Sequence, residues 1–313
     1  MTQTMNKDVK LSIVIPVYNS QFFVKKTVNE IIKEVTKLTP EFEIILVNDG
    51  SPDNSWEVIS GLANKINEVK AINLVKNYGQ HTAVMCGIEK STGDYIVTMD
   101  DDLQNPPSEI KKLLNKIEEG YDLVFAEFEQ KKHASYRRLG TKIVDWLNNK
   151  IFSKPDDIVL TNFRIFTQAL AKRVIKYRVN EPYIPGLLLM HASKIGNTLT
   201  KHAKRDDGES NYSIGKILIL IGRLLFNYSS YPLKALSVIG IIISVVSFFW
   251  GLFMVINQFI YGSDVQGWTT LVALLSFLNG FIILILGVLG EYVIRISKTL
   301  SHDCSYHISE EVE

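Results

Sequence analysis

The chain lacks the sequence features of several large protein classes. Its two cysteines, Cys86 and Cys304, are far apart in 313 residues, which excludes a disulfide framework and a cysteine zinc site and fits a reducing compartment. A formal net charge of +1 gives no whole-chain attraction to nucleic acid. The first eight residues contain no apolar core, so no cleavable signal peptide is expected. Neither G-x-G-x-x-G nor G-x-x-x-x-G-K-[ST] follows the first apolar run, which disfavours dinucleotide dehydrogenases and P-loop NTPases.

Charge is also absent from two long stretches near the C-terminal end. Residues 235–263 and 265–290 contain no charged side chain, and each stretch exceeds the roughly 20 apolar residues that a membrane-crossing helix needs. We therefore expect two transmembrane helices with a short connecting loop; a very apolar buried hairpin in a soluble core is the alternative. Basic residues flank the pair at both outer ends and are absent from the loop, so the positive-inside rule places both ends in the cytoplasm.

The first 126 residues alternate between two kinds of apolar pattern. Unbroken β-branched runs predict buried strands, and apolar side chains at every third or fourth position predict helices. The predicted strands cover residues 11–16, 43–47, 71–75, 94–99 and 122–126, and the predicted helices include residues 23–38, 82–90 and 108–119. This alternation predicts a mostly parallel α/β sheet covered on both faces. In such sheets, ligands bind beyond the carboxyl ends of the strands.

Three adjacent carboxylates, Asp100–Asp102, follow directly after the fourth predicted strand. Like charges this close repel one another unless a cation lies among them. A divalent metal that holds a diphosphate would supply that cation, whereas an acidic surface turn is the alternative. Pro16–Asn19 and Asp49 also follow predicted strands, so all three segments are expected at one crevice. This convergence favours a metal-diphosphate site.

The segment before the first charge-free stretch has a mixed character. Residues 214–226 are apolar with Lys216 and Arg223 interspersed. This pattern is typical of a helix that lies in the membrane interface, and its position just before a predicted membrane span favours that location. A helix in a soluble core is the alternative.

The ordered motifs resemble those of a known enzyme family. The motifs are Ser12–Asn19, Val47–Ser51, Asn77–His81 and Asp100–Pro107, with Gly208–Tyr212 and Gly287–Tyr292 further along the chain. Together they resemble the family 2 glycosyltransferases with a GT-A fold. More narrowly, the chain is similar to polyprenyl-phosphate glycosyltransferases, among them the undecaprenyl-phosphate aminoarabinose and glucosyl transferases and dolichyl-phosphate mannose synthase.

The resemblance implies a domain order and a reaction. It implies a GT-A domain over residues 1–212, a juxtamembrane amphipathic segment over 213–233, a two-helix transmembrane hairpin over 234–294 and a cytoplasmic C-terminal tail over 295–313. The expected reaction is metal-dependent, inverting transfer of a sugar from a nucleotide-diphosphate sugar to undecaprenyl phosphate, at the cytoplasmic face of a bacterial inner membrane. The product would serve cell-envelope glycan modification. A homo-oligomer, by resemblance a tetramer, and no nucleic acid partner are expected.

The resemblance also assigns roles to individual residues. Positions that hold the nucleoside are matched by Pro16, Val17, Tyr18 and Asp49. The D-x-D-x-Q element at the donor diphosphate is matched by Asp100, Asp101, Asp102 and Gln104, with Asp102 and Gln104 as ligands of Mg²⁺ or Mn²⁺. Arg205 matches a basic residue that closes over the diphosphate. An Arg-x-x-x-Ser element that holds the lipid phosphate is matched by Arg137 and Thr141, and Arg164 is a further cation for that phosphate. Catalytic roles are expected for Asp100, Asp102 and Arg137.

Three departures from the family pattern leave the donor sugar open. Ser20 and Glu127 stand where many relatives have glutamate and a basic residue, respectively. Asn162 stands where some relatives have aspartate, and an amide cannot accept a proton, so no general base is assigned.

A processive polysaccharide synthase would need a longer membrane channel and a Gln-x-x-Arg-Trp element. A non-catalytic sugar-nucleotide-binding membrane protein would be expected to have lost the acidic triplet or Gln104.

Overall fold

A computed structural model of the chain describes residues 9–128, 135–177, 182–201, 214–229, 231–261, 267–300 and 306–313. The chain divides into two compact units. The first comprises residues 1–212 together with 304–313, and the second comprises residues 213–303.

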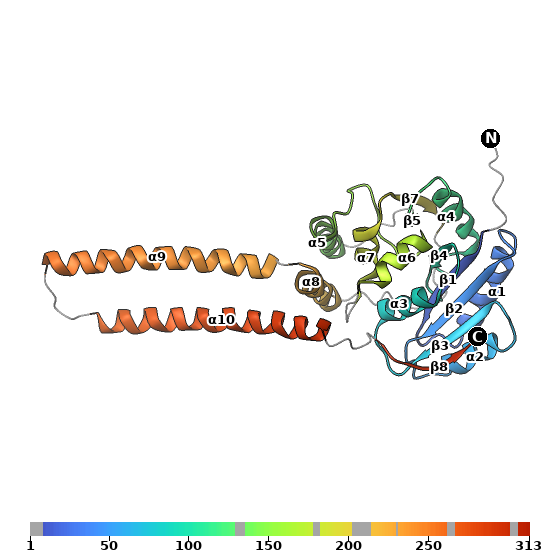
Figure 1. Ribbon diagram of the computed structural model, residues 1–313, viewed down its shortest axis with the longest axis horizontal. Coiled ribbons are helices and arrows are strands. Elements are labelled where there is room, and N and C mark those ends of the chain that lie inside the picture. The colour runs from blue at the N-terminus through green and yellow to red at the C-terminus, as the bar shows by residue number, and fades with distance from the viewer. Residues whose placement is uncertain are drawn as a thin grey trace. The chain divides into compact units, whose positions relative to one another are not determined.

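The first unit is built on an eight-stranded sheet (Figure 1). Its strands are β1 (Leu11–Val17), β2 (Phe42–Asn48), β3 (Val69–Leu74), β4 (Tyr95–Thr98), β5 (Leu123–Phe128), β6 (Arg164–Thr167), β7 (Ile195–Thr200) and β8 (Ile308–Val312). Their order across the sheet is β7-β5-β6-β4-β1-β2-β3-β8. Parallel pairs join β1 to β2 and β4, β2 to β3, and β5 to β7, while β6 and β8 run antiparallel to their neighbours. The predicted mostly parallel α/β sheet is confirmed.

Helices cover both faces of this sheet. They are α1 (Val24–Val35), α2 (Ser55–Ala63), α3 (Gln80–Lys90), α4 (Ile110–Ile117, after the 3-10 turn Pro107–Glu109), α5 (Ser135–Phe152), α6 (Gln168–Ile175) and α7 (Ile184–His191). The apolar sides of α1, α2 and α4 join the core on one face. Against the other face lies α3, which contacts β1 and β2 and has α6 and α7 beside it. A Cβ atom on Gly87 of α3 would lie 2.3 Å from Val14 Cγ1, so this close approach requires glycine.

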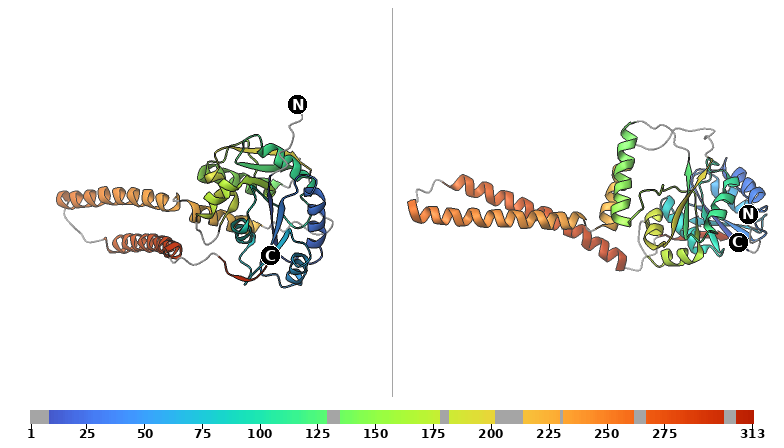
Figure 2. Two further views of the ribbon diagram at one scale, coloured as in Figure 1. Left: turned by 45° about the vertical axis from the view of Figure 1, so that its right-hand side comes forward. Right: turned by 90° about the horizontal axis from the view of Figure 1, so that it is seen from above.

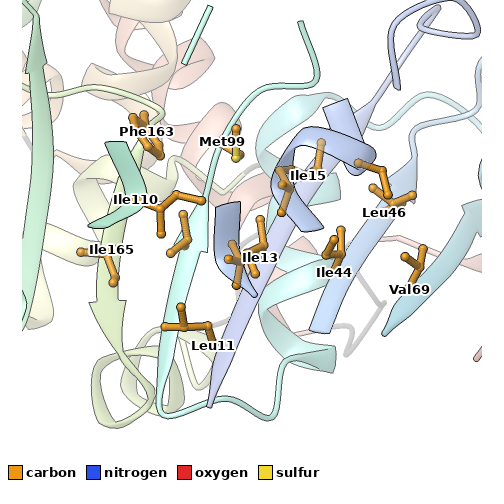
Figure 3. Close-up of a cluster of buried hydrophobic side chains, with 14 of the residues drawn as sticks. Leu11, Ile13, Ile15, Ile44, Leu46, Val69, Met99, Ile110, Phe163 and Ile165 are labelled. Atoms are coloured by element: carbon orange, nitrogen blue, oxygen red, sulfur yellow. The ribbon is translucent and has the colours of Figure 1, made fainter. Parts of the chain in front are cut away.

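Side chains of the central strands alternate between the two faces. Leu11, Ile13 and Ile15 of β1 point to the same side as Ile44 and Leu46 of β2, where they form the centre of the core (Figure 3). The intervening residues of these strands are equally buried, on the side of α3. Burial on both faces explains why the strands are unbroken apolar runs in the sequence.

A buried carboxylate, Glu43, joins three segments at the amino ends of the strands. Its Oε1 accepts hydrogen bonds from Ser12 Oγ at 2.6 Å and from the backbone N–H of Thr92 at 2.7 Å, and its Oε2 lies 3.2 Å from Lys70 Nζ. Burial raises the pKa of Glu43, but these donors outweigh burial and leave the pKa below its usual 4.5. The folded protein therefore favours the charged form.

Glu43→Gln is expected to destabilise the first unit by about 1–3 kcal/mol at pH 7, because the amide cannot accept the same set of charge-assisted hydrogen bonds. The stabilisation by Glu43 is fully present above about pH 4.5 and is lost as the pH falls through the folded-state pKa. Thermal unfolding of both proteins between pH 7 and pH 3 tests this expectation. The difference in Tm should shrink toward acid pH, and a pH-independent difference would contradict the assigned charge state.

The last residues of the chain complete one edge of the sheet, where β8 lies beside β3 (Figure 1). Lys90 Nζ lies 2.6 Å from Glu311 Oε2, and Trp56 Nε1 donates a hydrogen bond to Glu310 Oε2 at 3.1 Å. The predicted C-terminal tail thus contributes an edge strand to the sheet of the first unit.

In the second unit, the described residues form helices. They are α8 (Ile214–Tyr228), α9 (Tyr231–Tyr261) and α10 (Trp268–Leu300), and α9 and α10 lie side by side as a hairpin (Figure 2). Tyr292 Oη donates a hydrogen bond to the Ser229 carbonyl at 3.2 Å. Within the described ranges, no helix combines the length and the apolar character that crossing a membrane requires. The predicted transmembrane pair is therefore not confirmed.

Candidate functional site

A small cavity lies at the carboxyl ends of β1 and β4. Its lining residues come from β1, α3, the end of β4 and the start of β6: Pro16, Gln80, His81, Val84, Thr98, Met99, Asp100, Asn162 and Arg164. Among the residues predicted for the site, Pro16, Asp100 and Arg164 meet here. Gln80 was missed as a site residue, although the motif Asn77–His81 that contains it was recognised.

Asp100 lies two residues beyond β4 and is held by two amides from different segments. Its Oδ1 accepts a hydrogen bond from Gln80 Nε2 at 2.7 Å and from Asn162 Nδ2 at 3.4 Å. Burial raises the pKa of Asp100, and the neighbouring Asp102 charge raises it further, while the amides and the Arg164 charge oppose the shift. A cation bound near Asp100 would offset both effects that disfavour its charged form.

Arg164, the first residue of β6, supplies a fixed positive charge in the cavity wall. The residue is 1% exposed, its Nε donates to Thr98 Oγ1 at 3.0 Å, and its Nη1 donates to the Thr161 carbonyl at 3.4 Å. Burial lowers the pKa of Arg164 to about 10, so the guanidinium stays charged at neutral pH. The structure thus places this predicted lipid-phosphate residue in an enclosed position, where its charge acts on Asp100.

The other two carboxylates of the triplet differ from Asp100 in their surroundings. The Asp101 carbonyl accepts a hydrogen bond from Thr27 Oγ1 at 2.6 Å, which ties the triplet to α1. Burial raises the pKa of Asp101 to about 7. Asp102 instead contacts the side chain and backbone of Gln104, because the chain turns at Leu103, whose φ is +57°. Gln104 Nε2 lies 2.6 Å from Asp102 Oδ2, and the Gln104 N–H donates to Asp102 Oδ1 at 3.1 Å.

The Asp102–Gln104 pair has the chemistry of a partial site for a hard cation. One carboxylate and one amide can supply oxygen ligands once the Gln104 amide, which donates from Nε2 to Asp102 Oδ2, turns its Oε1 toward the cation. Mg²⁺ is usually bound by one or two carboxylates together with substrate phosphates. In the part of the chain that the structure describes, no group of three or more His, Cys, Asp or Glu residues is placed to hold a metal. A metal at this pair would therefore take its remaining ligands from substrate phosphates and water.

Asp49 connects the loop after β2 with the loop after β3. It is 2% exposed, and its two oxygens accept hydrogen bonds from the backbone N–H groups of Tyr78 at 2.7 Å and Gly79 at 2.9 Å. Burial raises the pKa of Asp49, although both hydrogen bonds oppose the shift. Of the other predicted nucleoside residues, Val17 is fully buried and Tyr18 is 47% exposed.

The predicted lipid-phosphate residues fall mainly outside the described side chains. Arg137 and Thr141 lie in the first two turns of α5, four positions apart on one helix face, but their side chains are outside the description. Arg205 lies outside the described residues altogether.

His81, which lines the cavity, packs edge-on against Tyr183, with ring centroids 5.4 Å apart.

Solved structures share this fold. The structure of glucosyl-3-phosphoglycerate synthase from Mycobacterium tuberculosis in complex with Mn²⁺, uridine diphosphate and phosphoglyceric acid matches with a TM-score of 0.53 and 15% identity, over 70% of this chain and 76% of that chain. The complex of the same synthase with Mn²⁺, uridine diphosphate and glucosyl-3-phosphoglycerate matches with a TM-score of 0.52 and 14% identity, over 70% and 78%. The expected GT-A fold is confirmed.

Sequence comparison extends the likeness to nearly the whole chain. Undecaprenyl-phosphate 4-deoxy-4-formamido-L-arabinose transferase of Proteus mirabilis (strain HI4320) is 33% identical over 99% of this chain and 96% of its own length. The transferase of that name from Photorhabdus laumondii is also 33% identical, over 97% and 94%. The profile of "Glycosyl transferase family 2" matches residues 12–177. The chain therefore belongs to glycosyl transferase family 2 and is a glycosyltransferase.

Proposed function

We propose that this glycosyltransferase moves a sugar from a nucleotide diphosphate to undecaprenyl phosphate, with inversion at the anomeric carbon, and that the product serves modification of cell-envelope glycans. The main support for the proposal is the arrangement of the acidic triplet after β4: Asp100 lines the cavity, and Asp102, whose charge acts on Asp100, pairs with Gln104. The full-length similarity to undecaprenyl-phosphate sugar transferases supports the acceptor.

In this reaction, an oxygen of the lipid phosphate forms a bond to the anomeric carbon while the bond from that carbon to the nucleotide diphosphate breaks. Asp102 and Gln104 would hold Mg²⁺ or Mn²⁺, which when bound neutralises negative charge on the leaving diphosphate. Asp100 and Asp101 line the donor, and Arg205 adds positive charge over the diphosphate. The nucleoside is assigned to Pro16, Val17, Tyr18 and Asp49.

The acceptor needs positioning more than activation. A phosphate monoester is already anionic at pH 7, so it attacks without a general base, and the amide of Asn162 could not serve as one. Arg137 and Thr141, which share one face of α5, are proposed to hold the lipid phosphate, with Arg137 supplying the charge. Arg164 adds a fixed positive charge to the cavity wall near Asp100.

We also propose that α9 and α10 bring the chain to the bilayer that contains the acceptor. Their charge-free stretches carry exposed apolar side chains along both helices, among them Ile241, Val246, Phe249, Leu271, Ile282 and Leu286. Large exposed apolar surfaces mark membrane or protein contacts. Basic residues flank the pair at both outer ends and are absent from the loop between them, so the positive-inside rule places both ends at the cytoplasmic face. Assembly into a tetramer stays a prediction.

Purified protein with undecaprenyl phosphate, Mg²⁺ or Mn²⁺ and a panel of UDP-, GDP- and dTDP-sugars tests the reaction. We expect release of a nucleoside diphosphate from at least one donor, dependent on the lipid phosphate and stopped by EDTA. Donor binding without release would favour the non-catalytic alternative, and products with several sugars would favour a processive synthase. Release from no donor would overturn the proposal.

A further inference from the structure

Thr98, the last residue of β4, carries a buried hydroxyl group between two other segments of the site. The residue is 1% exposed. Its Oγ1 accepts a hydrogen bond from Arg164 Nε at 3.0 Å and donates one to the Asn162 carbonyl at 2.8 Å. A hydroxyl group can do both at once, because it has one proton and two lone pairs. Thr98 therefore joins the buried guanidinium of β6 to the residue that lies two positions before β6.

Asn162 extends this connection to the acidic triplet. Its carbonyl is held by Thr98, while its side-chain Nδ2 donates to Asp100 Oδ1 at 3.4 Å. The backbone from Thr98 to Asp100 closes the ring of contacts, so the position of each member depends on the other two. From α3, Gln80 Nε2 donates to the same oxygen of Asp100 at 2.7 Å.

The two amides bind one oxygen of the Asp100 carboxylate and leave the other for a ligand. Within the described residues, the hydrogen bonds to this carboxylate end on Oδ1. Amides carry no net charge, so they orient the carboxylate without neutralising it. A side chain that is already held in one orientation loses little conformational entropy when a ligand binds to it. Oδ2 of Asp100 is thus prepared to accept a hydrogen bond.

We propose that three side chains act as positioning residues for the donor: Gln80, Thr98 and Asn162. They fix Oδ1 of Asp100, so that Oδ2 accepts a hydrogen bond from a hydroxyl group of the nucleotide sugar. Thr98 acts through Asn162 and touches no substrate itself. The inference rests on the proposed function in that Asp100 lines the donor there, and it assigns a role to a buried residue below the site.

Thr98→Val tests this inference, because valine has the shape of threonine but neither donates nor accepts a hydrogen bond. We expect the donor KM to rise about fivefold, the effect of losing one hydrogen bond of ordinary strength. The value of kcat should stay nearly unchanged, since the donor loses this contact in the ground state and the transition state alike. Thr98→Ser keeps the hydroxyl group and should restore most of the donor affinity. The KM for undecaprenyl phosphate should not change in either variant.

Thr39→Val is the matched control for the loss of a buried hydroxyl group. Thr39 is 2% exposed, and its Oγ1 donates to the Val9 carbonyl at 2.6 Å, at the amino end of the sheet. This variant should lower the Tm but leave the donor KM unchanged. If Thr98→Val and Thr39→Val have the same donor KM, the inference is overturned, because Thr98 would then stabilise the fold without orienting Asp100.

Gln80→Ala tests the same carboxylate from an exposed residue, so the fold of this variant should not be affected. We expect the donor KM to rise, again with little change in kcat, because Asp100 Oδ1 loses the shorter of its two hydrogen bonds. Asn64→Ala is the control: it removes another exposed amide, directly after α2, whose Nδ2 donates to the Ser60 carbonyl at 3.0 Å. A donor KM that Gln80→Ala leaves unchanged would overturn the inference.

Calorimetric titration separates this inference from the proposed function, because it measures donor binding without transfer. Wild type and Thr98→Val are titrated with the UDP-, GDP- and dTDP-sugars of the donor panel in the presence of Mn²⁺. If the wild-type chain binds a nucleotide sugar but transfers none, the proposed function fails, while a higher donor Kd for Thr98→Val still supports the inference. If the wild-type chain transfers sugar and Thr98→Val has the same donor Kd, the inference fails and the proposed function stands.

Discussion

Asp102→Asn is expected to lower kcat by at least about 100-fold, because it removes the carboxylate charge from the pair that would hold the metal against the leaving diphosphate. Asparagine keeps the shape of the side chain and one of the two oxygens that accept hydrogen bonds from Gln104, so the turn at Leu103 should persist and most of the loss should lie in the chemistry. Higher Mn²⁺ concentrations should recover part of the activity, since the remaining defect is weaker metal binding. Sugar transfer at several Mn²⁺ concentrations measures both effects.

Asp157→Asn makes the same chemical change at an exposed carboxylate beyond α5 and serves as the matched control. It should leave kcat and the metal dependence unchanged. Near-normal turnover by Asp102→Asn, with an unaltered metal requirement, would refute the metal role of Asp102.

Arg164→Met is expected to destabilise the first unit by about 3–5 kcal/mol, the usual cost of removing one partner from a buried set of charges. The change removes the positive charge that opposes the rise in the pKa of Asp100, and it removes the donors to Thr98 Oγ1 and to the Thr161 carbonyl. Addition of Asp100→Asn should recover part of the lost stability, since it removes the uncompensated charge. Denaturant unfolding followed by circular dichroism measures each variant.

Arg173→Met provides the control for this loss. Arg173 lies on α6 with a 42% exposed side chain, 3.8 Å from Asp122, and exposed pairs of this kind contribute roughly 0–1 kcal/mol. If Arg164→Met costs no more than Arg173→Met, the guanidinium does not stabilise the half-buried Asp100 carboxylate. If Asp100→Asn brings no recovery, the two charges are not coupled.

The central sheet could be predicted because its strands are buried on both faces. Such strands appear in the sequence as unbroken apolar runs, and the five predicted strands correspond to β1–β5 of the structure. The position of Asp100–Asp102 at a strand end followed from the same pattern. Local sequence therefore determined the elements whose burial is uniform along their length.

Features that depend on long-range pairing could not be predicted in this way. The short segment Ile308–Val312 has two glutamates at its centre and becomes a strand only because β3 offers an open edge. Residues 163–166 suited a strand or a loop edge equally, and pairing with β4 and β5 makes β6 a strand.

The enclosed position of Arg164 also escaped prediction. Arginine is mostly exposed in proteins, so the residue type at position 164 gives no sign of full burial. Only the antiparallel pairing of β6 with β4 places its guanidinium beside Thr98, where its charge acts on Asp100. Gln80 belongs to the recognised motif Asn77–His81, which could have marked it as a site residue. The hydrogen bond from Gln80 to Asp100, however, depends on where α3 begins.

Mass spectrometry of the lipid product shows directly whether the chain transfers one sugar to undecaprenyl phosphate. Undecaprenyl phosphate is incubated with the purified chain, Mn²⁺ and each donor. The lipid is then extracted, and its mass is determined by mass spectrometry. We expect a new lipid, heavier than undecaprenyl phosphate by one sugar less water, which forms with the wild-type chain and is absent with Asp102→Asn. Undecaprenyl phosphate that stays unmodified with every donor, under conditions in which the chain binds a nucleotide sugar, would contradict this expectation.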